Sequence, residues 1–453
     1  MKNVKLKAFV AFLSILVLGM FLVACGNDEP EVADEPEVTE APPADEEPEP
    51  EPEDDGDDLD PVTITVGWWG GQARHDITIE AIELFMELYP HITVTEEFHG
   101  WDDYWTMLNT AAVGNSLPDV IEMDITRISE FHDNGLIIGL NDFINRGVID
   151  MSNVDMAAYQ AMLNIDGEYR GISLGANGFA MVYNTELAEE LGFVFTPELT
   201  WNEFGDFLRE AGADREDFYG FGFGAEYEIF TIFTRDSGYS VYGDGELAVP
   251  REVLVDFFEM LDEWNRDEII MTHVREDGMT EGQNALHHEI LLAQMFASNQ
   301  IVWQQGEVDA ELGLALLPRV EGGRGGNWIR SSMQFAISAQ SGTAEQEAAA
   351  LFIDFFTNNL EANEILRAER GAPISSVVMA HLRDMVDPVV VKTFDILPIM
   401  AANASPADPL PPAEQAAVRT AFFYAVEAVR HGDFTPEEAA DHVIAGAEDA
   451  FSW

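Results

Sequence analysis

The chain has 453 residues, enough for about three domain-sized pieces and at least one large core. Its 22 basic residues face 84 acidic ones, and the resulting net charge of −62 excludes nucleic acid as a ligand because the phosphate backbone would be repelled. With 47% hydrophobic and 11% aromatic residues, most of the chain is expected to be globular.

The first 24 residues have the pattern of a secretion signal. Lys2, Lys5 and Lys7 precede an apolar run over residues 8–24, which is short and wrongly flanked for a stop-transfer helix. The run ends in the lipobox-like sequence LVAC, whose last residue is Cys25. We therefore predict that residues 1–24 are a signal peptide and that Cys25 is lipidated, which would anchor the protein to the cell membrane.

Cys25 is the only cysteine, so an internal disulfide is excluded, and the alternative to lipidation is a buried free thiol. Residues 25–60 follow as a predicted disordered tether. Positions 26–60 hold 18 acidic residues, seven prolines and no lysine or arginine, a composition that favours an extended, unfolded chain. An acidic tail that binds a partner is the alternative for this segment.

Strand and helix signals alternate from residue 62 onward. The alternating β-branched run VTITV predicts a first strand, and apolar residues at helical spacing up to Pro90 predict a helix after it. A βαβ arrangement continues with a second helix and a buried strand. The elements predicted here are strands 62–66, 92–94 and 119–123 and helices 79–89 and 104–113.

The same alternation continues to the end of the chain. Asp166-Gly167 between short apolar runs predicts a hairpin, and Thr200 followed by Glu203 has the form of a capping box before a helix. Further helices are expected near residues 253–264, 344–356 and 415–429, and no fixed-period repeat is present. The predicted fold class is α/β.

Several segments in a fixed order are similar to those of one protein family. They are VTITVGWWGG (62–71), LPDVIEMD (117–124), GISLGANGFAMVYN (171–184), TWNEF (200–204), SNQ (298–300) and RGAPI (370–374). Together with the lipobox and the tether, they resemble the extracellular solute-binding proteins of ABC sugar importers, the maltose-binding-protein-like group. The resemblance covers most of residues 61–380.

The resemblance implies a two-lobed, periplasmic-binding-protein-like α/β fold with a ligand cleft between the lobes. It implies that the lobes are joined by several crossings of the chain, which we expect near residues 175–178, 328–332 and 370–373. The family's partners would be a carbohydrate and membrane-embedded ABC permease subunits. We predict an N-terminal lobe of residues 61–175 plus 333–372 and a C-terminal lobe of residues 176–332 plus 373–453.

Candidate ligand-binding residues follow from the chemistry of sugars, whose C–H faces stack on aromatic rings and whose hydroxyls bond to planar polar side chains. Tryptophans in strand-end loops are the first choice, with neighbouring arginine, carboxylate and amide groups as hydroxyl partners. The predicted ligand-binding residues are Trp69, Arg74, Trp101, Asp124, Asn177, Asn299, Gln300 and Trp328.

Each candidate also has an ordinary structural explanation. Trp68 and Trp105 are weaker stacking candidates, and Trp201 and Trp264 are expected in the core. Arg74 would serve equally well in an ion pair with a nearby acid, and the aspartate and asparagine candidates suit caps and turns.

Three further motifs suggest other chemistry. GISLG at 171–175 has the form of a nucleophile elbow around Ser173, but a strand rather than a helix is expected after it. HHE at 287–289 lacks the spacing of a zinc site. EGGRGG at 321–326 lacks the ending of a P-loop and is expected to be a flexible loop.

The prediction is therefore a lipid-anchored extracellular protein that captures a mono- or oligosaccharide and delivers it to an ABC transporter permease. We expect a monomer without enzyme activity, cofactor or metal. Two alternatives stay open: a surface lipoprotein hydrolase, either esterase or glycosidase, and a binding protein for a polyol or a uronate-containing oligosaccharide. Whether Arg74 reads a carboxylated sugar also stays open.

Overall fold

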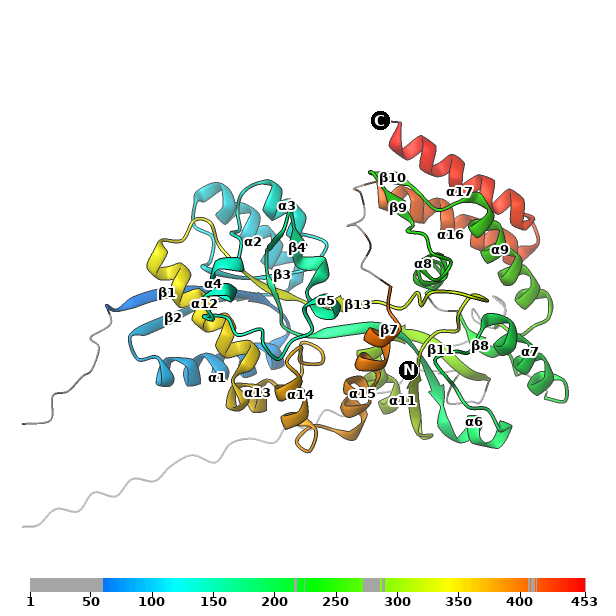
Figure 1. The fold of residues 1–453 in the computed structure, drawn as a ribbon, viewed down its shortest axis with the longest axis horizontal. Coiled ribbons are helices and arrows are strands. Elements are labelled where there is room, and N and C mark those ends of the chain that lie inside the picture. Colours follow the sequence, from blue (N-terminus) through cyan, green and yellow to red (C-terminus); the bar gives the residue numbers. More distant parts are fainter. Residues whose placement is uncertain are drawn as a thin grey trace, which may run out of the picture. The chain divides into compact units, whose positions relative to one another are not determined.

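A computed structural model describes residues 60–215, 218–223, 225–271, 286, 290–405, 408, 412 and 414–452 (Figure 1). The predicted signal peptide, the predicted lipidation site Cys25 and all but the last residue of the predicted tether lie outside the described residues. The HHE motif at 287–289 lies outside them as well.

One sheet of the described residues has the strand order β2-β1-β3-β14-β6. The strands β2 and β3 run parallel to β1, whereas β14 is antiparallel to β3 and β6. Ile64 and Val66 of β1 are fully buried, as the alternating β-branched pattern predicts. The elements of this part are β1 (Val62–Trp69), α1 (Gln72–Leu88), β2 (Ile92–His99), α2 (Trp101–Gly114), β3 (Val120–Met123), α3 (Ile128–Asp133), α4 (Asn141–Asn145), α5 (Met156–Tyr159), η1 (Ala161–Leu163), β4 (Asn164–Ile165), β5 (Glu168–Tyr169) and β6 (Ile172–Ser173).

A second sheet has the order β12-β7-β11-β8, and β13 pairs with the first part of β7. The long strand β7 is antiparallel to β11, β12 and β13. The elements from here to the return into the first sheet are β7 (Ala176–Asn184), α6 (Thr185–Leu191), α7 (Trp201–Gly212), β8 (Gly220–Gly222), α8 (Glu226–Asp236), β9 (Tyr242–Gly243), β10 (Glu246–Leu247), α9 (Arg251–Arg266), β11 (Leu291–Ala297), η2 (Ser298–Gln300), α11 (Ile301–Glu307), β12 (Leu312–Ala315), β13 (Ile329–Ser331) and β14 (Gln334–Ile337).

The remaining helices cover the two sheets. The helix α12 packs on β1 and β14 and α13 packs on α1, whereas α15 packs on β7 and β12. Figure 1 shows α16 and α17, coloured orange and red, beside the green α9, and these three helices contact one another. Their bounds are α12 (Thr343–Asn358), α13 (Leu360–Leu366), α14 (Ser376–Leu382), α15 (Pro388–Ala402), α16 (Gln415–His431) and α17 (Pro436–Phe451).

Three chain segments meet where the two sheets are connected. Ser332 N donates to Gly175 O at 3.0 Å, and Ala176 exchanges backbone hydrogen bonds of 2.8 and 3.2 Å with Ala372. A β-carbon on Gly175 would lie 2.4 Å from the carbonyl oxygen of Arg370, so the close approach requires glycine. These segments coincide with the expected chain crossings, while the lobe boundaries themselves stay predictions.

The local predictions agree with the structure. Asp166 and Gly167 connect β4 and β5 with φ of 55° and 84°, and Thr200 forms the predicted capping box of α7 with Glu203. Trp201 and Trp264 lie in the core, as expected, and the α/β class is confirmed. Within the described ranges, none of the helices has both the length and the apolar character needed to cross a bilayer.

Candidate functional site

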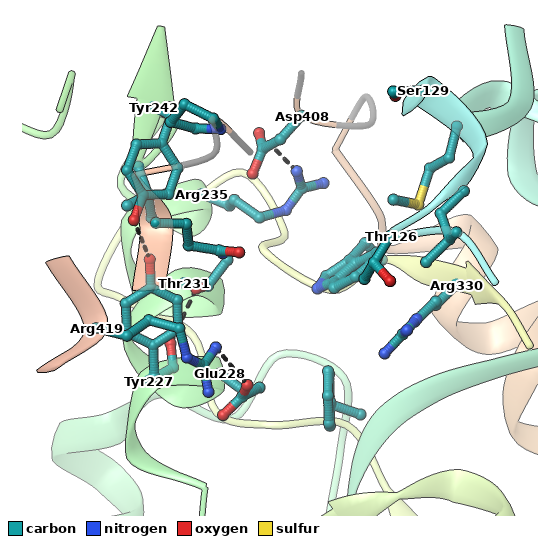
Figure 2. Close-up of a pocket in the computed structure, with 17 residues that line it drawn as sticks. Thr126, Ser129, Tyr227, Glu228, Thr231, Arg235, Tyr242, Arg330, Asp408 and Arg419 are labelled. Carbon is teal, nitrogen blue, oxygen red and sulfur yellow. Dashed lines mark hydrogen bonds and ion pairs between the residues drawn. The ribbon is translucent and has the colours of Figure 1, made fainter. Parts of the chain in front are cut away.

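A pocket of about 400 Å³ is lined by side chains from α8, α16, β13 and the segment after β3 (Figure 2). This volume falls in the range of about 300–1,000 Å³ that is usual for small-molecule sites. The helix α8 contributes Tyr227, Thr231 and Arg235, which share one helix face because they recur every four residues. We therefore treat this pocket as the candidate binding site.

Two tyrosines form part of the wall on the α8 side. The hydroxyls of Tyr227 and Tyr242 lie 2.8 Å apart and share a hydrogen bond. Burial raises the pKa of both phenols, so both stay neutral at physiological pH. Their rings give the pocket apolar surface next to polar groups, a combination suited to stacking against a sugar ring.

Two of the three pocket arginines are tied to carboxylates. Arg235, whose side chain is 2% exposed, pairs with Asp408 at 2.7 Å and also donates to two backbone carbonyls at 3.0 Å. Arg419 pairs with Glu228 at 2.9 Å, and its guanidinium lies 4.2 Å from the centroid of the Tyr227 ring. These ion pairs fix the position of this wall. They also engage Asp408 and Glu228, the two acidic residues that line the pocket.

Arg330 is the third pocket arginine and is placed differently. It lies on β13, where its backbone pairs with Asn177 of β7, and its labelled side chain in Figure 2 points into the pocket. Among the described residues, its only ion pair is with Asp124 at 3.7 Å, which is beyond hydrogen-bond length. Its side chain is 39% exposed. Of the three arginines, Arg330 therefore has the longest distance to its carboxylate partner.

The glycine-rich segment before β13 is fixed to the end of α8. The carboxylate of Asp236 accepts hydrogen bonds from the backbone N–H groups of Val320 and Gly325. A β-carbon on Gly326 would lie 2.0 Å from the carbonyl oxygen of Ile232, so the segment packs directly on the helix backbone. The segment 321–326 is a loop, as expected, and the buried carboxylate of Asp236 holds it at both ends; its flexibility stays a prediction.

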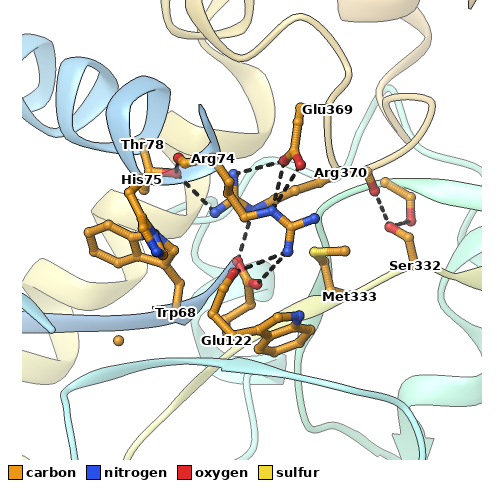
Figure 3. A network of polar contacts seen from close by, with 12 residues as sticks. Trp68, Arg74, His75, Thr78, Glu122, Ser332, Met333, Glu369 and Arg370 are labelled. Atoms are coloured by element: carbon orange, nitrogen blue, oxygen red, sulfur yellow. Dashed lines mark hydrogen bonds and ion pairs between the residues drawn. The ribbon is translucent and has the colours of Figure 1, made fainter. Parts of the chain in front are cut away.

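A second group of charged side chains, which we call the Glu122 cluster, lies at the end of the first sheet and does not line the pocket (Figure 3). Glu122 is fully buried and accepts a 2.7 Å hydrogen bond from Arg370. Arg370 also donates to Thr78 at 3.0 Å, and Arg74 donates to Glu369 at 2.9 and 3.0 Å. Burial raises the pKa of Glu122, while the charges of Arg370 and Arg74 oppose that shift.

Some predicted ligand-binding residues lie at or beside the pocket. Trp328 lines it. Asp124, at the end of β3, accepts hydrogen bonds from the backbone and hydroxyl of Thr126 and faces Arg330 with its other oxygen. Asn177 is the strand partner of Arg330, and its Oδ1 atom is buried without a hydrogen bond among the described residues.

The other predicted residues lie elsewhere. Trp69 is buried and packs edge-on against the half-exposed Trp101, with ring centroids 5.1 Å apart. Arg74 belongs to the Glu122 cluster. Asn299 and Gln300 are exposed in η2, before α11. None of these five residues lines the pocket, and their roles in binding stay predictions.

Several lining residues were not predicted from the sequence. They are Tyr227 and Arg235, which share the helix α8, and Arg330 and Arg419, which come from distant segments. One local signal was present: Tyr227, Thr231 and Arg235 recur every four residues in the helix EYEIFTIFTRD and so share one face. Arg330 and Arg419 have no such signal, because only the tertiary fold brings them to α8.

The alternative of a Ser173 nucleophile finds no structural support. Ser173 is fully buried, donates to Gly175 O at 2.7 Å and accepts from Ser331 at 2.8 Å. The segment that follows it is the strand β7, as expected, whereas a nucleophile elbow needs a helix there.

Comparison with known proteins places the chain among binding proteins. The model of the family described as "Bacterial extracellular solute-binding protein" matches residues 72–361. An extracellular solute-binding protein of family 1 from Alicyclobacillus acidocaldarius has a similar structure, with a TM-score of 0.78 and 25% identity, over 87% of this chain and 99% of that one.

Two more distant structures share the fold. A periplasmic oligogalacturonide-binding protein from Yersinia enterocolitica has a TM-score of 0.71 and 20% identity over 86% of this chain and 99% of that one. A cyclic alpha-maltosyl-1,6-maltose binding protein from Arthrobacter globiformis has a TM-score of 0.67 and 18% identity over 86% and 99%. The predicted two-lobed α/β fold is thereby confirmed, and the chain belongs to the bacterial extracellular solute-binding protein family.

Proposed function

We propose that this protein captures a mono- or oligosaccharide outside the cytoplasm and delivers it to the permease subunits of an ABC transporter. The observation that carries the proposal is the pocket, which combines aromatic surface from Tyr227, Tyr242 and Trp328 with charged side chains. Sugars offer both C–H faces and hydroxyls, so they suit such a wall. Two structurally similar proteins with oligosaccharides in their names support this choice of ligand class.

We further propose that the two lobes close on the ligand. The predicted boundaries assign residues 61–175 plus 333–372 to one lobe and 176–332 plus 373–453 to the other. The hydrogen-bonded segments around Gly175, Ser332 and Ala372 support a hinge there. A ligand that contacts both lobes favours the closed state by its differential affinity. Small-angle scattering should give a smaller radius of gyration with saturating sugar, and an unchanged radius would contradict closure.

Attachment to the membrane rests on the lipobox at Cys25. The proposed lipid anchor would keep the binding protein close to its permease, with the acidic tether giving it reach. The variant Cys25→Ala should move the protein from the membrane fraction to the soluble fraction without changing its thermal midpoint. Equal membrane retention of both forms would contradict lipidation at Cys25.

A thermal-shift screen of the purified protein against a panel of mono- and oligosaccharides tests the binding function directly. A ligand present at 100 times its Kd stabilises the native state by about 2.7 kcal/mol, which raises the midpoint measurably. A midpoint that no sugar raises would contradict the proposal. Release of products from a bound sugar would instead favour the hydrolase alternative.

A further inference from the structure

We propose that the bound sugar carries a carboxylate and that Arg330 is its partner in the pocket. This inference rests on the proposed function and specifies its ligand class as uronate-containing sugars. The guanidinium group presents five N–H donors in a planar fork that matches the two oxygens of a carboxylate.

Basic residues are concentrated in the wall of the pocket. Only 22 of 453 residues are basic in a protein with 84 acidic residues, yet three arginines line this single pocket. Arg235 and Arg419 are neutralised by Asp408 and Glu228 at 2.7 and 2.9 Å. The separation of 3.7 Å between Arg330 and Asp124 leaves most of its donors available. The residues that line the pocket therefore include three basic and two acidic groups, whereas acidic residues far outnumber basic ones in the chain as a whole.

The balance of hydrogen-bonding groups in the pocket also favours a carboxylate. A neutral sugar offers hydroxyls that both donate and accept, so its site needs acceptors as well as donors. Here the pocket carboxylates already accept from arginines, and Oδ1 of Asp124 already accepts from Thr126. Arg330 is the charged group of the wall with the most hydrogen-bonding capacity left, and all of that capacity is for donation. A carboxylate accepts and does not donate, so it fits Arg330 better than a hydroxyl does.

Trp328 adds an independent observation to this balance. Its indole Nε1 atom is buried and has no hydrogen-bond acceptor among the described residues, although the residue lines the pocket. Leaving such a donor unsatisfied costs about 1–3 kcal/mol in folded proteins, so a shift of the ring on binding that brings an acceptor to Nε1 would be favoured. The unpaired indole N–H and the accessible guanidinium of Arg330 are both donors, which favours an acceptor-rich ligand.

The test compares sugars that differ only in charge. Calorimetry and thermal shift on the purified protein would use galacturonate and glucuronate oligosaccharides of one to four units, each beside its carboxyl-reduced counterpart with the same rings and linkages. A third arm uses oligosaccharides without a carboxylate that carry a sulfate ester, and so present a different anion. We expect at least one uronate sugar to bind about tenfold or more tightly than its reduced form, as for hydrogen bonds to a charged group.

Variants assign the effect to Arg330. Arg330→Gln should lower the affinity for the uronate sugar by about tenfold or more and leave the reduced sugar nearly unaffected. Arg266→Gln is the matched control: it removes the same charge from an exposed position on α9 that does not line the pocket. Raising the salt concentration should weaken uronate binding in the wild type and in Arg266→Gln much more than in Arg330→Gln.

Each outcome has a definite meaning. Binding of neutral sugars alone overturns the inference and leaves the proposed sugar-binding function intact. Failure of neutral, sulfated and uronate sugars alike contradicts both. A preference for sulfate esters over uronates overturns the assignment to a carboxylate. A uronate preference that persists in the folded Arg330→Gln variant overturns the role of Arg330, and a thermal midpoint near that of the wild type confirms that the variant is folded.

Discussion

The pocket and the Glu122 cluster both contain arginine and carboxylate side chains, but these are paired differently in the two places. In the Glu122 cluster, the side chain of Arg370 is 3% exposed and bonds to a carboxylate that is fully buried. In the pocket, Arg330 is 39% exposed and lies 3.7 Å from Asp124, its partner among the described residues. Arginines that are buried and closely paired hold chain segments together, whereas one that is accessible and loosely paired is available to a ligand.

Arg74 and Arg330 differ in the same way, although each has a carboxylate near it in the folded protein. Arg74 donates to Glu369 at 2.9 and 3.0 Å and to the backbone carbonyl of Trp69 at 3.1 Å, and its side chain is 15% exposed, so it is held more firmly inside the protein than Arg330 is. The predicted ligand role of Arg74 and the inferred role of Arg330 are separable by experiment, because the first should affect stability more and the second affinity more.

The largest expected effect is that of breaking the Glu122 cluster. Arg370→Gln leaves the carboxylate of Glu122 buried without its 2.7 Å partner, which should lower the free energy of unfolding by about 3–5 kcal/mol. Urea-induced unfolding measures this loss. The control Arg383→Gln removes an exposed pair with Asp395 and should cost less than about 1 kcal/mol. An equal loss of unfolding free energy in the two variants would contradict the claim that the buried pair contributes more to stability than an exposed pair.

The next effect concerns the connection between the sheets beside that cluster. Gly175→Ala places a methyl group 2.4 Å from the carbonyl oxygen of Arg370 and should destabilise the protein by about 1–3 kcal/mol. Gly71→Ala is a suitable control, because Gly71 has an extended backbone and no atom within 4 Å of the added carbon. If both variants had the same thermal midpoint as the wild type, the close packing of the crossing segments would be refuted.

Replacing an aromatic residue of the pocket should affect binding more than stability. Trp328→Ala removes a ring from the wall, and the lost aromatic contact should weaken sugar binding by about 0.5–1.5 kcal/mol beyond the loss of buried area. Trp303→Ala, which removes a 60% exposed ring on α11, should leave affinity unchanged. Calorimetric titration decides between these results, and equal affinities in both variants would exclude Trp328 from the binding site.

The smallest effect is a pH dependence near the Glu122 cluster. Trp68 donates to Nδ1 of His75 at 3.1 Å, and burial together with the charge of Arg74 lowers the pKa of His75. The unfolded chain then binds this proton more readily, so stability should fall as the pH drops below about 6.5, by at most about 1.4 kcal/mol per pH unit.

The variant His75→Asn isolates this titration, because the asparagine oxygen replaces Nδ1 as an acceptor without binding a proton. Thermal midpoints at about pH 7.5 and 5.5 should differ less for the variant than for the wild type. The same drop in both would show that other groups cause the pH dependence.

Local sequence patterns predicted the fold well because they depend on neighbours in the chain. The hairpin at Asp166-Gly167 and the cap at Thr200 each need only a few adjacent residues. The pocket is different, because Tyr227, Arg330 and Arg419 meet only after the chain has folded. A tryptophan such as Trp328 is conspicuous in any sequence, whereas an arginine becomes informative only when its distance to the nearest carboxylates is known.

The central claim is that the ligand binds in the pocket lined by α8, β13 and α16. Amide hydrogen exchange with and without the sugar that raises the thermal midpoint most tests this claim directly. The account predicts slower exchange on sugar binding in α8 (Glu226–Asp236), in β13 (Ile329–Ser331) and in the first turns of α16. Slower exchange confined to the segments around Trp101 and Asn299, with no change in these three elements, would contradict it.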